Sequence, residues 1–102
     1  MDKTAAYKIA ETYINSIGTK YTIIRAYLFG SYAKGNFNDD SDIDIAVVVD
    51  NVEDIIDTQI EMMKLRRKVD LRIEPHPFNK ADFNSNNPLA NEVIRHGIAI
   101  GK

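Results

Sequence analysis

The stretch LFGSYAKGNFNDDSDIDIAVVV, residues 28–49, is the part of the sequence that decides the fold. It begins as an apolar strand that ends at Gly30-Ser31 and continues through a short glycine-bounded segment and an acidic turn. Asp42 and Asp44 stand at the start of a second apolar strand. These residues could supply a phosphate-sized pocket and a pair of metal-binding carboxylates, so the segments on either side decide whether a site is complete.

The two aspartates are the candidate metal ligands. They are two residues apart at the start of a strand, so their side chains are predicted to project from the same face. Two neighbouring negative charges are unfavourable unless a cation lies between them. Carboxylate oxygens suit Mg²⁺ or Mn²⁺, which leave further positions for substrate phosphates. Taken alone, however, the SDID run is more typical of an acidic turn that precedes a strand.

Gly30-Ser31 is the candidate phosphate-binding turn. A strand that leads through glycine and serine into a helical turn presents free backbone N–H groups, and the glycine allows a phosphate to approach closely. The Ser31 hydroxyl can add a hydrogen bond. The segment GSYAKG lacks the Gly-Lys-Ser/Thr ending of a P-loop. As an isolated dipeptide, Gly-Ser is most often only a turn.

The segments before the second strand predict alternating helix and strand. Apolar residues from Lys3 to Ile17 recur with helical spacing, with Asp2 and Gly18 suited to the two helix ends. Residues 22–29 are rich in β-branched and aromatic side chains, which is typical of a buried strand. Residues 31–34 have the length of about one helical turn, and Ile43–Val49 is the second strand.

The segments after residue 50 continue the same alternation. Residues 52–63 predict a second amphipathic helix, which ends in the basic cluster of residues 64–68. The run VDLRIE, residues 69–74, alternates like a half-exposed strand, and Pro75 and Pro77 are predicted to end it. Asn87, Pro88 and Gly97 suit the ends of a last helix, followed by a short edge strand or packed segment at residues 98–100. This order predicts a small α/β (α+β) domain with a mixed sheet, residues 1–102 forming a single domain.

The predicted strand at residues 69–74 carries the candidate third carboxylate. With a period of two, Asp70, Arg72 and Glu74 share one face. Beside the second strand, one of these acids would complete a three-carboxylate cluster of the kind that holds two metal ions around a triphosphate. Asp70 is the first candidate and Glu74 the alternative, although a solvent face of alternating charges has the same pattern. His76, between the two prolines, is predicted to lie in a surface loop, and a rigid, extended position near the site is the alternative.

Composition limits the classes of function. The chain has 102 residues and no cysteine, which excludes disulfides and thiolate metal sites. It has no apolar run of about 18 residues and no apolar signal-peptide core, so a cytoplasmic protein without a membrane span is expected. Eight of its fifteen acidic residues lie between Asp39 and Asp57, which is a poor pattern for binding nucleic acid.

Gly30-Ser31, Asp42-Ile-Asp44 and a later acidic strand together resemble the DNA polymerase β-like nucleotidyltransferase superfamily. The sequence motif LFGSYAKG…SDIDIAV is most similar to the minimal, MNT-type branch of this superfamily. The resemblance implies that Gly30 and Ser31 hold a nucleotide triphosphate and that Asp42, Asp44 and Asp70 form the metal-binding and catalytic carboxylates. It also implies Mg²⁺, as two ions, and ATP as the donor of a nucleoside monophosphate.

Resemblance to the minimal branch also implies a partner. Such proteins are typically paired with a HEPN-family helical toxin, so we expect an antitoxin that adenylylates (AMPylates) a tyrosine of that toxin. Two other functions stay open: a binding module that neutralises its partner by contact, with a vestigial nucleotide site, and transfer to a small molecule. The oligomeric state, as a homo-oligomer or a hetero-oligomer, is left undetermined by the sequence.

Overall fold

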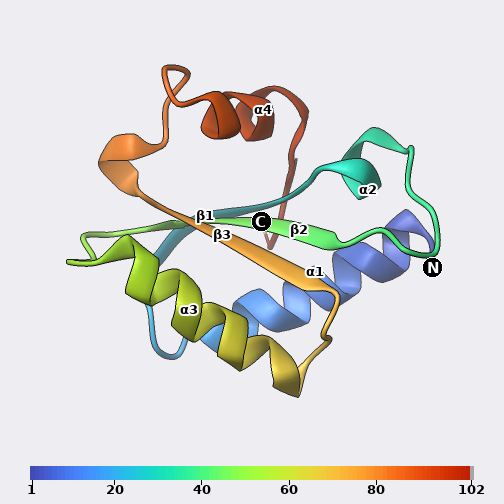
Figure 1. Ribbon diagram of the computed structural model, residues 1–102, viewed down its shortest axis with the longest axis horizontal. Coiled ribbons are helices and arrows are strands. Elements are labelled where there is room, and N and C mark those ends of the chain that lie inside the picture. The colour runs from blue at the N-terminus through green and yellow to red at the C-terminus, as the bar shows by residue number, and fades with distance from the viewer. Residues whose placement is uncertain (102) are drawn as a thin grey trace.

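The computed structural model describes residues 1–101 as a four-stranded mixed sheet with helices on both faces (Figure 1). The strands are β1 (Ile23–Phe29), β2 (Ile43–Val49), β3 (Ile73–Asn79) and β4 (Ile98–Ala99). The helices are α1 (Lys3–Ile17), α2 (Ser31–Lys34), α3 (Ile55–Leu65) and α4 (Pro88–His96), with the 3₁₀ turns η1 (Arg66–Lys68) and η2 (Lys80–Asp82). The expected small α/β fold with a mixed sheet is confirmed.

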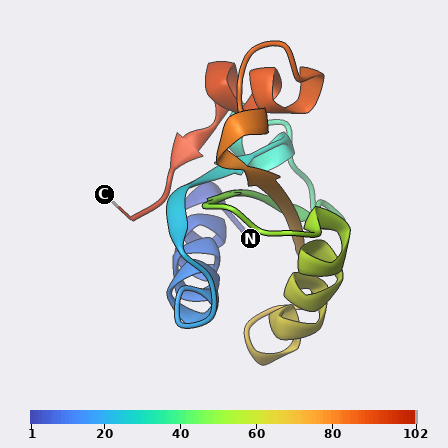
Figure 2. The same cartoon turned by 90° about the vertical axis from the view of Figure 1, so that its left-hand side faces the viewer.

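The sheet has the strand order β3-β2-β1-β4. β2 runs antiparallel to β1, whereas β2 and β3 are parallel because α3 carries the chain back to the end where β2 began. Figure 2 shows α1 and α3 on one face of the sheet and α4 with η2 on the other. The two central strands therefore lie between two helical layers.

The alternation of side chains along β2 explains both cores. The odd-numbered residues of Ile43–Val49 pack in one cluster with Tyr13 of α1 and Met62 of α3. Ala46 and Val48 pack in a second cluster beneath α4. Because side chains alternate between the two faces of a strand, Asp44 lies on the same face as Ala46. The candidate metal ligand is thus on the α4 side of the sheet.

The third strand differs from the prediction. The sequence predicted a strand over residues 69–74 that Pro75 and Pro77 would end, but β3 runs from Ile73 to Asn79 and contains both prolines. β3 is an edge strand, so every second N–H points away from β2 and a proline at those positions costs no ladder hydrogen bond. Residues 69–72 instead form a turn in which the Asp70 N–H donates to the Arg66 carbonyl over 2.9 Å.

The other elements lie close to their predicted positions. α1 begins after Asp2, whose side chain accepts from the Ala5 N–H over 2.8 Å, and α4 begins after Asn87 in the same way. α3 begins at Ile55 rather than Val52, because the Asp54 carboxylate caps it there. Within residues 1–101, the structure has no helix with the length and apolar character to cross a membrane.

Tyr21 links the start of β1 to α3 and makes stability depend on pH. Its hydroxyl donates to Glu61, which also pairs with Lys20 over 3.2 Å. Burial and the bond to Glu61 raise the pKa of Tyr21 to about 12, and the bond from Tyr21 lowers the pKa of Glu61. The stability from Tyr21 is therefore complete below about pH 10, its usual pKa, and is lost towards pH 12. The stability from Glu61 is present above its usual pKa of 4.5 and is lost in acid.

We expect Tyr21→Phe to reduce the loss of stability at alkaline pH. Between pH 8 and pH 11 the free energy of unfolding should fall more steeply for the wild type than for the variant, because only the wild type must keep Tyr21 protonated. Burial also raises the pKa of Tyr13, which remains in both proteins, so the fall should shrink rather than vanish. Urea unfolding at a series of pH values measures the difference. Parallel curves would contradict the expectation.

Candidate active site

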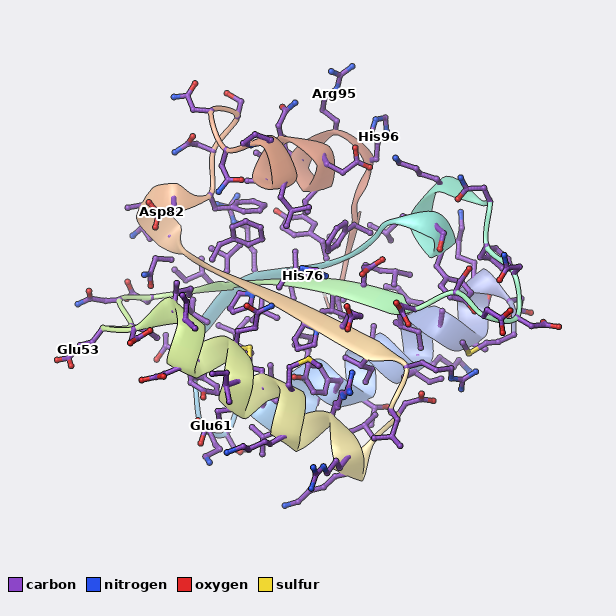
Figure 3. All side chains as sticks on the ribbon, viewed as in Figure 1. Glu53, Glu61, His76, Asp82, Arg95 and His96 are labelled. Carbon is purple, nitrogen blue, oxygen red and sulfur yellow. The ribbon has the colours of Figure 1, made fainter. Side chains whose placement is uncertain are left out.

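The candidate site lies on the α4 side of the sheet, where β2 and β3 run side by side. Asp44 of β2 is the register partner of Glu74 in β3, and His76 follows two residues later on the same face. Carboxylate oxygens of Asp44 and Glu74 and a ring nitrogen of His76 all lie within 4.8 Å of one another. In Figure 3, His76 lies at the sheet, whereas the other labelled side chains lie towards the periphery of the molecule. The strand pairing therefore creates a cluster of three possible metal ligands.

Gly30 brings the phosphate-binding turn against this cluster. Phe29, the last residue of β1, is the register partner of Asp44, so Gly30 follows directly beside the carboxylate. Gly30 has φ 73° and ψ −147°, and a Cβ at this position would overlap Asp44 Oδ2. Only glycine combines this backbone conformation with such a close approach. Both halves of the motif at residues 28–49 therefore meet at one point.

Asp44 is held from two sides. Its Oδ1 lies 3.1 Å from Nε2 of His76, and its Oδ2 faces Gly30. The ring of Phe29 packs edge-to-face on His76, with the centroids 5.0 Å apart. The side chains of Asp44 and His76 are 26% and 25% exposed, so both are ordered by neighbours and still open to a ligand.

The donor set fits a divalent cation. Carboxylates at directly paired positions of adjacent strands repel each other, and a cation between Asp44 and Glu74 would remove that repulsion. Arg66 lies 3.9 Å from Glu74, which is a long contact for an ion pair, and its guanidinium also donates to the Ile73 carbonyl. Two carboxylates that converge with free access from solvent are the ligands that Mg²⁺ and Mn²⁺ take.

Asp42 and Asp70 lie outside this three-residue cluster. Asp42 is exposed and stands in the loop one residue before β2. Asp70 lies in the turn before β3, not on the strand as predicted. Its two oxygens accept from Arg72 Nε over 2.9 Å and Nη2 over 2.6 Å, and this pairing lowers the pKa of Asp70. The acid that β3 places beside Asp44 is Glu74, the alternative named from the sequence.

Two further side chains lie near the residues of the motif. Lys34, at the end of α2, forms an ion pair of 2.6 Å with Glu92 of α4. His76 was predicted to lie in a loop, and that prediction is wrong, because β3 extends through both flanking prolines. The signal in the sequence was the alternation of Glu74, His76 and Phe78 across those prolines, which places all three on one face of a strand.

Comparison with known proteins places the chain in a family. A model described as "Polymerase beta, Nucleotidyltransferase" matches residues 11–102. A Methanocaldococcus jannaschii protein, provisionally named a protein adenylyltransferase, is 42% identical over 45 residues. The match covers 42% of this chain and 45% of the relative, so the chain aligns with less than half of that protein's length.

Solved structures share the fold. A provisionally named nucleotidyltransferase from Sulfolobus solfataricus superposes with a TM-score of 0.68 at 18% identity, covering 95% of this chain and 80% of that one. A toxin–antitoxin structure with AMP-PNP gives a TM-score of 0.64 at 24% identity, covering 91% and 70% of the two chains. At these identities the likeness concerns the fold alone. The family match, by contrast, covers most of the sequence and includes Gly30, Asp44 and Glu74, and the chain belongs to the polymerase β nucleotidyltransferase family.

Proposed function

We propose that this chain transfers AMP from ATP to a hydroxyl group of a partner protein, and that the acceptor is a tyrosine of a HEPN-type toxin. Family membership supports nucleotidyl transfer. The name of the M. jannaschii relative supports a protein acceptor, and the toxin–antitoxin neighbours support a toxin as partner. The observation that carries the proposal is the meeting of Gly30, Asp44 and Glu74 at one partly exposed point.

Each residue of the site has a role in this proposal. Gly30 and Ser31 hold the triphosphate, and Asp42 and Asp44 bind Mg²⁺. Glu74 takes the third carboxylate position in place of Asp70, because its side chain lies beside Asp44. Mg²⁺, as the two ions that the resemblance implies, would supply neutralisation of phosphate charge during the transfer.

The chemistry is a single displacement. The acceptor oxygen forms a bond to the α-phosphorus of ATP while the bond from that phosphorus to the pyrophosphate oxygen breaks. The hydroxyl proton passes to a carboxylate, and Glu74 is the third acid available for this transfer. Positioning and charge stabilisation therefore account for most of the rate enhancement. A tyrosine suits this acceptor role because its phenolic oxygen is an adequate nucleophile once a base assists it.

The test is label transfer from α-labelled ATP in the presence of Mg²⁺. The acceptor offered is a helical HEPN-type toxin, and the modified tyrosine is identified by mass spectrometry of the labelled peptide. We expect Asp42→Asn/Asp44→Asn to reduce labelling by about 10²–10³-fold, because the variant removes two charges that hold the metal. The control is Asp39→Asn/Asp40→Asn, which removes two exposed charges from the same loop and should retain activity.

Toxin activity separates the proposal from its alternatives. If the Asp42→Asn/Asp44→Asn variant still silences the toxin fully and no label appears, the chain acts by contact and the proposed transfer is wrong. Label that appears only on an added small molecule would identify a different acceptor class. Label on a toxin tyrosine that is lost in the double variant and kept in the control supports the proposed reaction.

A further inference from the structure

We infer that His76 supplies a nitrogen ligand to the metal at this site, and that the site consequently prefers Mn²⁺ to Mg²⁺. This inference rests on the proposed function for the identity of the site, and it adds a ligand that neither the resemblance nor the sequence pattern assigned. The three donor atoms come from Asp44, Glu74 and His76, and all pairs of them lie within 4.8 Å.

The spacing of the donors matches a coordination sphere. Adjacent ligands of an octahedral ion at about 2.1 Å stand about 3.0 Å apart, and opposite ligands about 4.2 Å apart. His76 Nε2 and Asp44 Oδ1 are separated by 3.1 Å, and Glu74 contributes an oxygen within 4.8 Å of both. One ion can therefore bind all three atoms once the side chains adjust around it.

The fold holds the imidazole in this position before any ion binds. Pro77 restricts the backbone of His76 to extended conformations, because its ring clashes with the preceding residue in other conformations, and the φ of Pro75 is itself fixed. The Phe29 ring contacts one edge of the imidazole, and three quarters of the His76 side chain is removed from solvent. A ligand that is already oriented loses little conformational entropy when the ion binds.

The chemistry of the donor set determines the preference. Mg²⁺ takes oxygen ligands almost exclusively and gives up its water reluctantly. Imidazole nitrogen suits transition metals, and the mixture of one nitrogen with carboxylate oxygens and phosphates also suits Mn²⁺. Nitrogen in place of water therefore strengthens Mn²⁺ binding more than Mg²⁺ binding, while the carboxylates still accept either ion.

The experiment is pulsed EPR of Mn²⁺ bound to the untagged chain without nucleotide, so that no nitrogen of ATP can contribute. The chain has two histidines, His76 and His96. His96 is exposed at the end of α4, far from the central strands in Figure 3, and His96→Gln is the matched control. We expect a ¹⁴N imidazole coupling in the wild type and in His96→Gln, and its loss in His76→Gln. Circular dichroism checks that each variant is folded, and His76→Asn is the replacement if His76→Gln is not.

Titration measures the preference separately. We expect His76→Gln to weaken Mn²⁺ binding by at least about tenfold and to change Mg²⁺ binding by less than about threefold. Wild-type protein that binds Mn²⁺ without ¹⁴N coupling would overturn the inference, and so would equal losses for both ions. The proposed function is tested by a different measurement, which is label transfer. If no label is transferred to any toxin, the proposed function is wrong, but a ¹⁴N coupling to bound Mn²⁺ would still support His76 as a ligand.

Discussion

Glu74→Gln is expected to reduce AMP transfer by about 10²–10³-fold, whereas Asp70→Asn should retain activity within a few-fold of the wild type. Glutamine keeps the size of the side chain but removes the negative charge that lies beside Asp44. Asp70, in contrast, already has both oxygens occupied by Arg72 in the turn before β3. The pair of variants therefore tests which acid is the third carboxylate.

Label transfer to the proposed toxin partner measures the rate, and Mg²⁺ affinity shows whether the loss comes from the metal. For Asp70→Asn we expect a loss of stability instead, of about 1 kcal/mol or less, because the ion pair with Arg72 is partly exposed. Urea unfolding measures it. If Asp70→Asn were inactive and Glu74→Gln active, the third carboxylate would be Asp70. That result would contradict the assignment of Glu74 from the strand register.

Gly30→Ala is expected to reduce Mg²⁺-dependent transfer by at least about a hundredfold, while Gly35→Ala should reduce only stability. Both glycines have positive φ, 73° and 87°. Gly35 is in the left-handed helical region, where alanine costs about 1–2 kcal/mol. Gly30, with ψ −147°, is in a region that essentially only glycine adopts, so alanine costs more there. At residue 35 the added methyl group meets nothing within 4 Å. At residue 30 it overlaps the Asp44 carboxylate, so the turn or the ligand must move.

Gly35→Ala controls for a methyl group added to a glycine with positive φ, whereas Gly30→Ala adds both the greater backbone strain and the overlap with Asp44. Transfer assays should show at least about a hundredfold loss for Gly30→Ala and little change for Gly35→Ala at a temperature where both are folded. Thermal unfolding supplies that check. If both variants kept full activity, the close approach of Gly30 to Asp44 would have no part in the reaction.

Local sequence patterns were sufficient for most of the fold. The helical spacing of Lys3–Ile17 and the apolar run of Ile43–Val49 depend on neighbours within a few residues, and both elements have the predicted bounds. The meeting of Gly30 with Asp44 could also be anticipated, because a short connection joins two antiparallel strands whose facing ends carry these residues. The predictions failed where the partner of a segment lies far along the chain.

The third strand illustrates that limit. Alternation predicts a strand over VDLRIE, and the two prolines predict its end, because a proline interrupts an interior strand. Whether a strand is interior or at an edge depends on the order of the whole sheet, which no local pattern contains. In the observed register, the acid beside Asp44 is Glu74 rather than Asp70. His76, which was predicted to lie in a loop, lies in the same strand as Glu74 and is a neighbour of Asp44.

The sequence by itself determined the helices, the two central strands and the motif that joins a phosphate-binding turn to an aspartate, because these follow from periodicity and short connections. Only the tertiary structure decided which later residues complete the site. The parallel pairing of β2 with β3 sets Glu74 opposite Asp44 and His76 beside it. That pairing joins two segments that are about 30 residues apart in the sequence. Its register depends on which side chains are buried on each face of the sheet, and the neighbouring residues in the sequence do not determine this.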